Sequence, residues 1–368
     1  MDTLALAHRW AGGFIGLLLA VLGLSGTLLI YEDAWVRATV PHAADTQVTD
    51  TAAIAASVGQ LLADPDTRPS SIVLSSAGNG VHRLYYGGEA GAYASQAGEV
   101  VTRWTSKWDR VEVWLFDLHH HLLAGETGEA VAGAAALAGL VFVVTGLVLW
   151  WRTWRLFSPR PWPRSLSRLA IVQHHRDMGA LAAPLLFLAL LTGAMMTMRP
   201  VSDFVLSPLS SAAQMRAATA PPTVEGGPLA ERLDWPAMLG AARARFPDAE
   251  FRTIGLPRKP GGLISLRMRQ PAEWLPNGRT NVWFEPSTGE IVAVRDALRL
   301  PTGSKASNMV YPLHAAKVGG LVYTALMTVT GLVLTLLGTL AVFSFWFASG
   351  SAIRWRRRAA ARERMAGE

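Results

Sequence analysis

Four long runs of apolar residues constrain the fold of this chain more than any other feature. No charged side chain lies within residues 11–30, 130–151, 178–198 or 318–350. A helix needs about 20 residues to cross a hydrocarbon layer of about 30 Å. Each run meets that length, so the sequence predicts an integral membrane protein with four spanning helices. The first run is longer than the apolar core of a signal peptide, and it is interpreted as an uncleaved anchor.

The basic residues between and after these runs predict the orientation. The segment that joins the second and third runs carries five arginines and no acid before its histidines, and the C-terminal segment RWRRRAAARER is similarly basic. Short arginine-rich loops remain in the cytoplasm. Both termini and the central loop are therefore predicted to be cytoplasmic. This distribution largely explains the net charge of +7, which is then no evidence for a nucleic-acid partner.

Two longer segments, residues 32–115 and 200–311, are predicted on the opposite, periplasmic side. In the first, helical spacing at 51–63 precedes strand-like segments at 71–76 and 81–87. The second repeats this order, with a helix at 235–246 followed by four strand-like segments. Its residues FEPSTGEIV are typical of a hairpin. Each segment is long enough for a small domain and is predicted to be α+β, with one helix on a small antiparallel sheet.

The two halves of the chain share a spaced motif. His8-Arg9 stands before the first apolar run and His175-Arg176 before the third, and each histidine precedes a small residue and a glycine by 17 positions, at Ser25-Gly26 and Thr192-Gly193. This predicts a parallel internal duplication. The expected order is spanning helices at 1–31, 116–152, 174–199 and 312–350, with the two domains, a basic loop at 153–173 and a basic tail at 351–368 between and after them.

Seven of the nine histidines lie beside a predicted spanning helix. The helices that start at the cytoplasmic face carry His8, His174 and His175, and those that start at the periplasmic face carry His119, His120, His121 and His314. Each face therefore offers imidazoles from two different helices. The remaining two, His42 and His82, are interpreted as ordinary surface residues.

Two imidazoles that approach from opposite sides are what six-coordinate haem b requires. The expected pairs are His8 with His175, and His119 or one of its two neighbours with His314. Arg9 and Arg176 are expected to bind haem propionates. Small residues that let a flat ring approach are Gly12, Gly13, Gly16, Gly139, Gly179, Gly319 and Gly320. The chain has no cysteine, which excludes c-type haem, iron–sulfur clusters and thiolate zinc. Two alternatives stay open: histidines that only cap helix ends or bind lipid headgroups, and a zinc or copper site without haem.

Several segments together resemble the PepSY-associated transmembrane helix family. They are LAHRWAGGFIGLLLAVLGLSGTLL, FDLHHHLLAGETGEAVAGAAALAGLVFVVTGLVLWW, HHRDMGALAAPLLFLALLTG and PLHAAKVGGLVYTALMTVTGLVL, and FEPSTGEIV resembles the turn of the PepSY module. The resemblance covers nearly the whole chain. It implies a bacterial inner-membrane protein with four spans, periplasmic PepSY domains and haem held by helix histidines, as in ferric-siderophore reductases. The family's histidines match His8, His119, His175 and His314. Residues 93–100 depart from the usual turn segment of the first PepSY module.

These features predict a transmembrane electron-transfer protein with two haems b. Electrons from a quinol or a cytoplasmic reductase are expected to reach a periplasmic ferric chelate, such as a ferric siderophore. Basic residues of the second domain, including Arg258, Lys259, Arg267 and Arg269, are expected to attract an anionic complex. Two other functions stay open: a scaffold without redox chemistry whose PepSY domains bind another envelope protein, and a membrane subunit that supplies electrons to a separate periplasmic reductase.

Overall fold

The computed structural model of the chain describes residues 2–347. It consists of two compact units, each assembled from segments that are far apart in the sequence. The helix unit comprises residues 2–30, 116–201 and 313–347, and the sheet unit comprises residues 31–115 and 202–312. The predicted basic tail at 351–368 lies outside the described residues.

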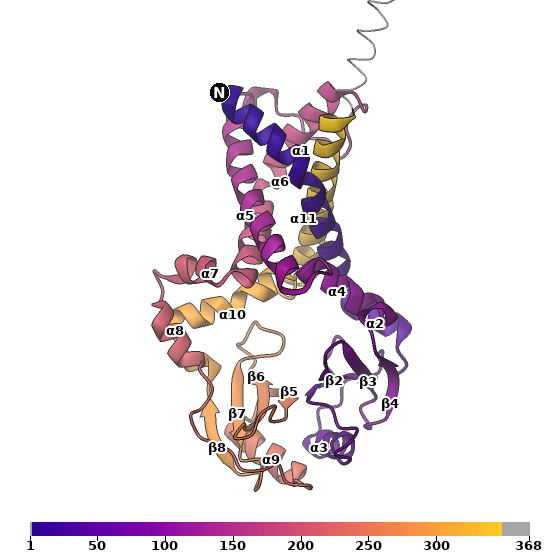
Figure 1. Cartoon of the computed structure of the whole chain (residues 1–368), viewed down its shortest axis with the longest axis vertical. Coiled ribbons are helices and arrows are strands. Elements are labelled where there is room, and N and C mark those ends of the chain that lie inside the picture. Colours follow the sequence, from indigo (N-terminus) through magenta and orange to yellow (C-terminus); the bar gives the residue numbers. More distant parts are fainter. Residues whose placement is uncertain (1, 348–368) are drawn as a thin grey trace, which may run out of the picture. The chain divides into compact units, whose positions relative to one another are not determined.

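The helix unit is a bundle of the four predicted apolar helices (Figure 1). Each is long and apolar enough to cross a membrane, because leucine, alanine and valine fill it over 27 residues or more. Ser167 caps the start of the third, accepting a hydrogen bond from the Ala170 amide. The four are α1 (Asp2–Leu29), α5 (Gly125–Trp151), α6 (Arg168–Thr197) and α11 (Gly320–Trp346).

Glycines set the close contact between α1 and α11. A methyl group at Gly16 would lie 2.8 Å from the Gly338 carbonyl oxygen, and one at Gly23 would lie 2.8 Å from the Gly331 carbonyl oxygen. Backbones can approach this closely only where side chains are absent, which is the usual way apolar helices pack in a membrane. Gly16 therefore serves the contact between these two helices, rather than the approach of a cofactor that the sequence analysis assigned to it.

A short helix ends immediately before each of α5 and α11. These are α4 (Val111–His121) and α10 (Thr302–His314). The chain reverses through left-handed residues, at Leu122 and Leu123 with φ of 47° and 61°, and at Ala316 with φ of 53°. Such values are unfavourable for residues with a Cβ. The second and fourth spans consequently begin at 125 and 320, later than the predicted 116 and 312, and their histidines lie at the ends of the preceding helices.

The sheet unit contains one antiparallel sheet of eight strands. Their order is β4-β3-β2-β1-β5-β6-β7-β8, so the two halves of the unit meet where β1 pairs with β5 and Ile72 lies opposite Ile254. The sequence analysis expected two separate small domains, whereas a single continuous sheet joins them. The strands are β1 (Ser71–Val73), β2 (His82–Gly87), β3 (Ala90–Ala94), β4 (Val100–Trp104), β5 (Glu250–Gly255), β6 (Ile264–Arg269), β7 (Thr280–Phe284) and β8 (Ile291–Arg295).

One helix from each half packs on the same core. α3 (Thr51–Leu61) precedes the first four strands and α9 (Trp235–Arg245) the second four. An aspartate caps each, with Asp50 accepting from the Ala53 amide and Asp234 from the Ala237 amide. Buried side chains from both helices and both half-sheets form one apolar cluster. The predicted helix-then-strands order and the hairpin at 284–292 are present in the structure.

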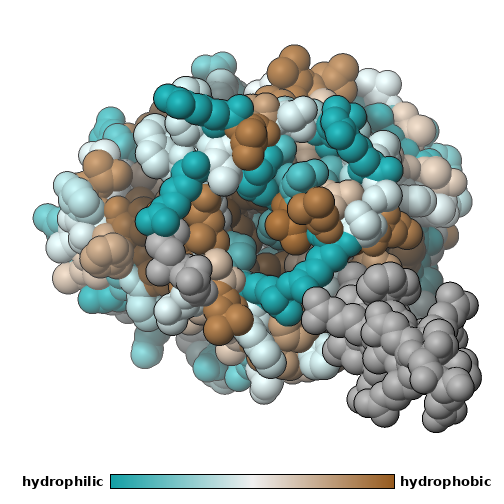
Figure 2. All heavy atoms as spheres, turned by 90° about the horizontal axis from the view of Figure 1, so that it is seen from above, coloured by the Kyte–Doolittle hydropathy of each residue, from teal (hydrophilic) through white to brown (hydrophobic). Residues whose placement is uncertain are grey.

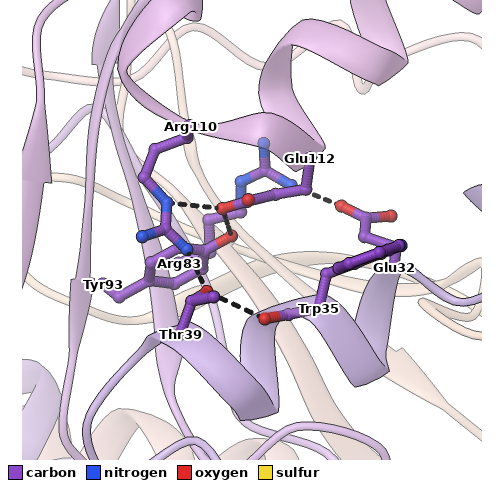
Figure 3. Close-up of polar contacts among 7 residues, drawn as sticks. All are labelled: Glu32, Trp35, Thr39, Arg83, Tyr93, Arg110 and Glu112. Atoms are coloured by element: carbon purple, nitrogen blue, oxygen red, sulfur yellow. Dashed lines mark hydrogen bonds and ion pairs between the residues drawn. The ribbon is translucent and has the colours of Figure 1, made fainter.

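The opposite face of the first half-sheet is covered by α2 (Glu32–Thr39) and the beginning of α4. Its polar groups form the network in Figure 3: the fully buried Glu112 accepts from the Tyr93 hydroxyl at 3.1 Å and from Arg110 Nε at 2.8 Å, and Arg83 pairs with Glu32 at 3.1 Å. Every arginine of this network has a carboxylate partner. The remaining α-helices of the described chain are α7 (Arg199–Leu206) and α8 (Ala212–Thr219).

The two histidines outside the helix unit differ in their surroundings. His42 is exposed and pairs with Asp45 at 3.0 Å, as expected for a surface residue. His82 is 1% exposed, so its assignment to the surface was wrong. Its Nδ1 accepts a hydrogen bond from the Ser75 amide, and its Nε2 lies 3.2 Å from the Ser57 hydroxyl. Burial lowers the pKa of His82 to about 4, so this imidazole is neutral at pH 7.

Candidate functional site

The helix unit brings four histidines together as two pairs, each with one member from each half of the chain. In the first pair, the ring centres of His8 on α1 and His175 on α6 are 6.2 Å apart, with ring planes at 83°. In the second pair, the ring centres of His119 on α4 and His314 on α10 are 6.1 Å apart, with planes at 37°. These are the pairs that the sequence analysis expected from the position of each histidine along its helix.

A hydroxyl group fixes the His8 ring and its tautomer. His8 Nδ1 lies 2.8 Å from Thr145 Oγ1 on α5. The Thr145 hydroxyl already donates to the Val141 carbonyl oxygen at 2.7 Å, as threonines within helices often do. It can therefore only accept from His8, which places the proton on Nδ1 and leaves Nε2 with a free lone pair.

The second pair is fixed by the same chemistry. His119 Nδ1 lies 3.0 Å from the Ser25 hydroxyl, which itself donates to the Val21 carbonyl oxygen. His314 Nδ1 lies 3.0 Å from Thr192 Oγ1 and 3.0 Å from the Ala189 carbonyl oxygen. These acceptors place the proton on Nδ1 in both rings, so Nε2 is the nitrogen available to a metal.

The glycine that follows each hydroxyl residue provides the surface on which the ring packs. A methyl group at Gly26 would lie 2.8 Å from His119 Cε1, and one at Gly193 would lie 3.1 Å from His314 Cε1. Ser25-Gly26 and Thr192-Gly193 are the two dipeptides whose equal spacing marked the repeat in the sequence. The spacing alone did not reveal what these dipeptides do. In the structure, Ser25-Gly26 holds His119 of the first half, and Thr192-Gly193 holds His314 of the second half.

The spacing within each pair fits a metal bound between the rings. An imidazole nitrogen binds a metal at about 2.0 Å and lies about 1.1 Å from its own ring centre, so two imidazoles on one iron have ring centres about 6.3 Å apart. The observed separations are 6.2 and 6.1 Å. Two rings that touch without a metal between them need not have this centre-to-centre separation, yet both pairs do.

Space for a flat ligand is present beside the first pair. Gly12 and Gly179 each lie one helical turn after a first-pair histidine; a methyl group at Gly12 would meet no atom within 4 Å, and one at Gly179 would meet only Leu337 at 3.9 Å. The four histidine rings are themselves only half-buried. Figure 2, which views the end of the molecule where the chain begins, shows hydrophilic side chains around a hollow with hydrophobic atoms inside it. At the first pair, the residues present therefore fit a haem held by two histidines.

Comparison with known proteins adds the family. The model of the PepSY-associated TM region matches residues 5–348, which is nearly the whole chain. The chain belongs to the PepSY-associated TM region family. It is also 28% identical over 149 residues to the Uncharacterized protein PA4219 of Pseudomonas aeruginosa, a match that covers 39% of this chain and 37% of that protein. The chain thus matches only about a third of the length of this relative.

Membership of the PepSY-associated TM region family and the four apolar helices show that the chain is a membrane protein.

The other candidate histidines of the chain have different neighbours. His120 stacks on Phe116 with ring centres 4.7 Å apart, and His121 binds Asp117 at 3.0 Å. His174 is 5% exposed and its Nε2 lies 3.2 Å from the Pro161 carbonyl oxygen. Among the described residues, none of these three rings makes a ring contact with any of the four paired histidines.

The two arginines expected to bind propionates are also placed differently. Arg176 makes two hydrogen bonds to Asp177, at 2.7 and 3.0 Å, and a third to the Leu156 carbonyl oxygen at 2.9 Å. It is therefore occupied by its own helix and by the preceding loop. Arg9 is exposed, and its guanidinium carbon lies 5.6 Å from the centre of the Phe345 ring. Of these two arginines, Arg9 is the one whose guanidinium makes no hydrogen bond or ion pair with another described residue.

Most of the expected glycines have other roles. Gly13 lies against the Phe345 ring and Gly139 against Leu190, while Gly319 and Gly320 adopt positive φ at the turn into α11. Within residues 2–347, no group of three or more histidine, cysteine, aspartate or glutamate side chains is arranged to hold a metal ion. The arrangement that remains is two imidazoles per site, which suits an iron whose other four ligands come from a porphyrin.

Proposed function

We propose that this chain is a transmembrane electron-transfer protein that binds two haems b and reduces a ferric chelate, such as a ferric siderophore. His8 and His175 would hold the inner haem, and His119 and His314 the outer one. The observation that carries this proposal is the repeated geometry of the pairs: two imidazoles from different helices, about one bis-imidazole iron spacing apart. In three of the four rings a bound Nδ1 directs Nε2 to the metal.

The spacing along the helices supports a role across the membrane. His8 and Ser25, which contacts His119, are 17 residues apart on α1, and His175 and Thr192 have the same spacing on α6. A rise of 1.5 Å per residue separates the two pairs by about 25 Å, close to the thickness of a hydrocarbon core of about 30 Å. One site therefore lies near each surface of the bilayer.

Bound haem would supply one-electron Fe(III)/Fe(II) chemistry at each site. The chain itself holds the imidazoles, directs the Nδ1 protons of His8, His119 and His314 to hydroxyl and carbonyl oxygens, and surrounds the sites with apolar helices. Oxidation of one quinol releases two electrons and two protons, which balances the reduction of two ferric chelates to the ferrous state. Iron(II) binds hard oxygen ligands more weakly than iron(III), so reduction releases the metal.

The arginine-rich loop and tail support an orientation with both termini in the cytoplasm of a bacterium and the sheet unit in the periplasm. The matched histidines, the matched small residue and glycine pairs, and the helix-then-four-strands order of each half support a parallel internal duplication. In that arrangement each PepSY-like domain corresponds to one half of the eight-stranded sheet.

The first experiment is a visible spectrum of the purified full-length protein with a haem-to-chain ratio. We expect a Soret band, dithionite-sensitive α and β bands, and two haems per chain. His8→Ala should remove the inner haem and His314→Ala the outer one. His120→Ala is the matched control, because its ring stacks on Phe116 outside both pairs. If His8→Ala and His314→Ala both keep two haems, the ligand assignment is wrong.

The same sample separates the competing functions. A folded but colourless protein would favour a scaffold without redox chemistry. A protein with two haems that reduces no ferric chelate, yet reduces a periplasmic partner protein, would favour an electron-supplying subunit. Anaerobic reduction of ferric siderophores, followed with a ferrous-specific chelator, is the direct assay of the proposed reaction.

A further inference from the structure

One face of the second half-sheet carries a row of arginines. The sheet register places Arg267 on β6 opposite Asn281 on β7, and Asn281 opposite Arg295 on β8. Neighbouring strands are about 4.8 Å apart, so the two arginine Cα atoms are about 10 Å apart with Asn281 between them. Arg279 precedes Asn281 by two residues and therefore lies on the same face. The backbone positions of the three arginines therefore flank that of Asn281.

The protein balances the charges of this row only in part. Arg267 is half-buried, yet its side chain makes no hydrogen bond or ion pair with any residue in the range 2–347. The Arg279 side chain is exposed and likewise makes none within that range. Burial, followed by the charge of Arg279, lowers the pKa of both Arg267 and Arg295. A guanidinium that is partly removed from water beside a like charge gains from an anion more than an exposed one does.

The carboxylate of Glu273, whose charge acts on Arg267 and Arg279, is already hydrogen-bonded to other groups. Glu273 is 7% exposed, and its two oxygens accept from the backbone amides of Gln270 and Arg279 and from the Thr280 hydroxyl. It offsets part of the charge without pairing with a guanidinium. Arg295 donates to the Ala220 carbonyl oxygen, and its guanidinium carbon lies 4.7 Å from the centre of the Trp283 ring. An apolar ring is thus part of the same face.

The first half-sheet provides an internal comparison. On its corresponding face, Arg83 is paired with Glu32 and the covering Arg110 with Glu112 (Figure 3), and Val36 of α2 is buried against the same face. In this network a carboxylate accompanies each arginine. The second half keeps the arginines on this face without those carboxylates, which is typical of a site that receives its anion from outside.

We propose that the face formed by Arg267, Arg279 and Arg295, with Asn281 and Trp283, binds a small polycarboxylate metal chelate. Arginines whose Cα atoms span about 10 Å can together reach an oxygen-rich ligand with several carboxylates, and each guanidinium can bind one of them bidentately. This deepens the proposed function, on which the identity of the chelated metal as iron rests. It also narrows the basic surface expected from the sequence: Arg267 belongs to the site, Arg269 lies 3.9 Å from Glu250, and Arg258 and Lys259 are exposed outside it.

Binding can be measured without any redox reaction. The probe is gallium(III) citrate, which cannot be reduced under these conditions, titrated calorimetrically into the full-length protein in detergent at about 50 mM salt, where charge attraction is little screened. Arg267→Gln and Arg279→Gln should each weaken binding by about tenfold or more, as expected for the loss of a charged hydrogen-bonding partner. Arg267→Lys, which keeps the charge but not the fork, should lie between them and the wild type.

The matched control is Arg258→Gln, which removes the same charge from an exposed arginine of the same half. It should change binding by less than about twofold, because a solvated charge outside the arginine row contributes little. Each variant's thermal unfolding is measured so that loss of fold is not counted as loss of binding. Absence of gallium citrate binding to the wild type, or equal weakening by Arg258→Gln and Arg267→Gln, overturns the proposal. If gallium citrate binds to a protein that lacks haem, the anion site is supported and the proposed function is wrong. If the protein holds two haems but does not bind gallium citrate, the proposed function is supported and the anion site is wrong.

Discussion

Replacing Gly26 with alanine tests whether the second histidine pair is held by its glycine seat. The added methyl group would lie 2.8 Å from His119 Cε1, about 0.6 Å inside the 3.4 Å at which ordinary contact begins. The helix backbone cannot yield, since Gly26 belongs to α1, so the His119 ring must move away from it. A metal ligand has to be held to within about 0.5 Å of its working position, and the displacement exceeds that tolerance.

Overpacking of this kind costs about 1–3 kcal/mol, which corresponds to roughly 5- to 150-fold in the affinity of the second site. We therefore expect the purified variant to hold one haem in place of two, with the first pair retained. Gly193→Ala should have the same effect more weakly, because its methyl group would lie 3.1 Å from His314 Cε1. The assay is a haem-to-chain ratio combined with a redox titration that resolves the two sites.

Gly240→Ala is the matched control, since a methyl group there would meet no atom within 4 Å on the exposed side of α9. It should keep both haems and leave stability equal or slightly higher, because alanine favours a helix. Two haems with unchanged potentials in Gly26→Ala would refute the reasoning. So would an equal loss of haem in Gly240→Ala, which would show that the loss does not depend on the contact with His119.

Three further predictions follow from named contacts. Thr145→Val removes the acceptor of the His8 Nδ1 proton, so the haem affinity of the first site should fall by about tenfold or more. The reduction potential of that site should rise, because a less basic imidazole stabilises Fe(III) less. Competition with apomyoglobin measures the affinity, and a redox titration measures the potential. Arg110→Met leaves the fully buried Glu112 without its ion pair and should cost about 3 kcal/mol of unfolding free energy, which Arg110→Met with Glu112→Leu should largely restore. Burial lowers the pKa of His82 to about 4, so between pH 6.5 and pH 4 only the unfolded chain takes up the proton. The free energy of unfolding should therefore fall by about 3 kcal/mol as the pH decreases from 6.5 to 4. His82→Gln should flatten this pH dependence in unfolding curves, and an unchanged slope would contradict the prediction.

The sequence was sufficient for the membrane helices because their signal is local. Each apolar run needs only its own composition to be recognised, and α1, α5, α6 and α11 lie within or close to the predicted bounds. The grouping of His8 with His175 and of His119 with His314 also followed from the position of each residue along a helix. Helical rise converts sequence position directly into depth within a bilayer.

Contacts between distant segments were not accessible in this way. No local pattern shows that β1 pairs with β5, so the two halves were expected to be separate domains. Thr145 was missed as the partner of His8, because a single threonine within an apolar helix carries no signal of its own. His82 was placed in a strand-like segment but assigned to the surface, since its burial depends on contacts with Ser57 of α3 and with Ser75. The breaks after His121 and His314 depend on left-handed residues that are not glycine, which composition does not favour.

Each histidine pair takes one ring from the first half of the chain and one from the second. During synthesis, His8 and His119 leave the ribosome well before His175 and His314. Neither pair can exist until the third helix has been inserted, and the second pair has to await the residues just before the fourth. A ligand of the first pair must therefore await the third helix, and a ligand of the second pair must enter an almost finished protein. A truncated product that ends before residue 168 would carry two solitary imidazoles and no complete site.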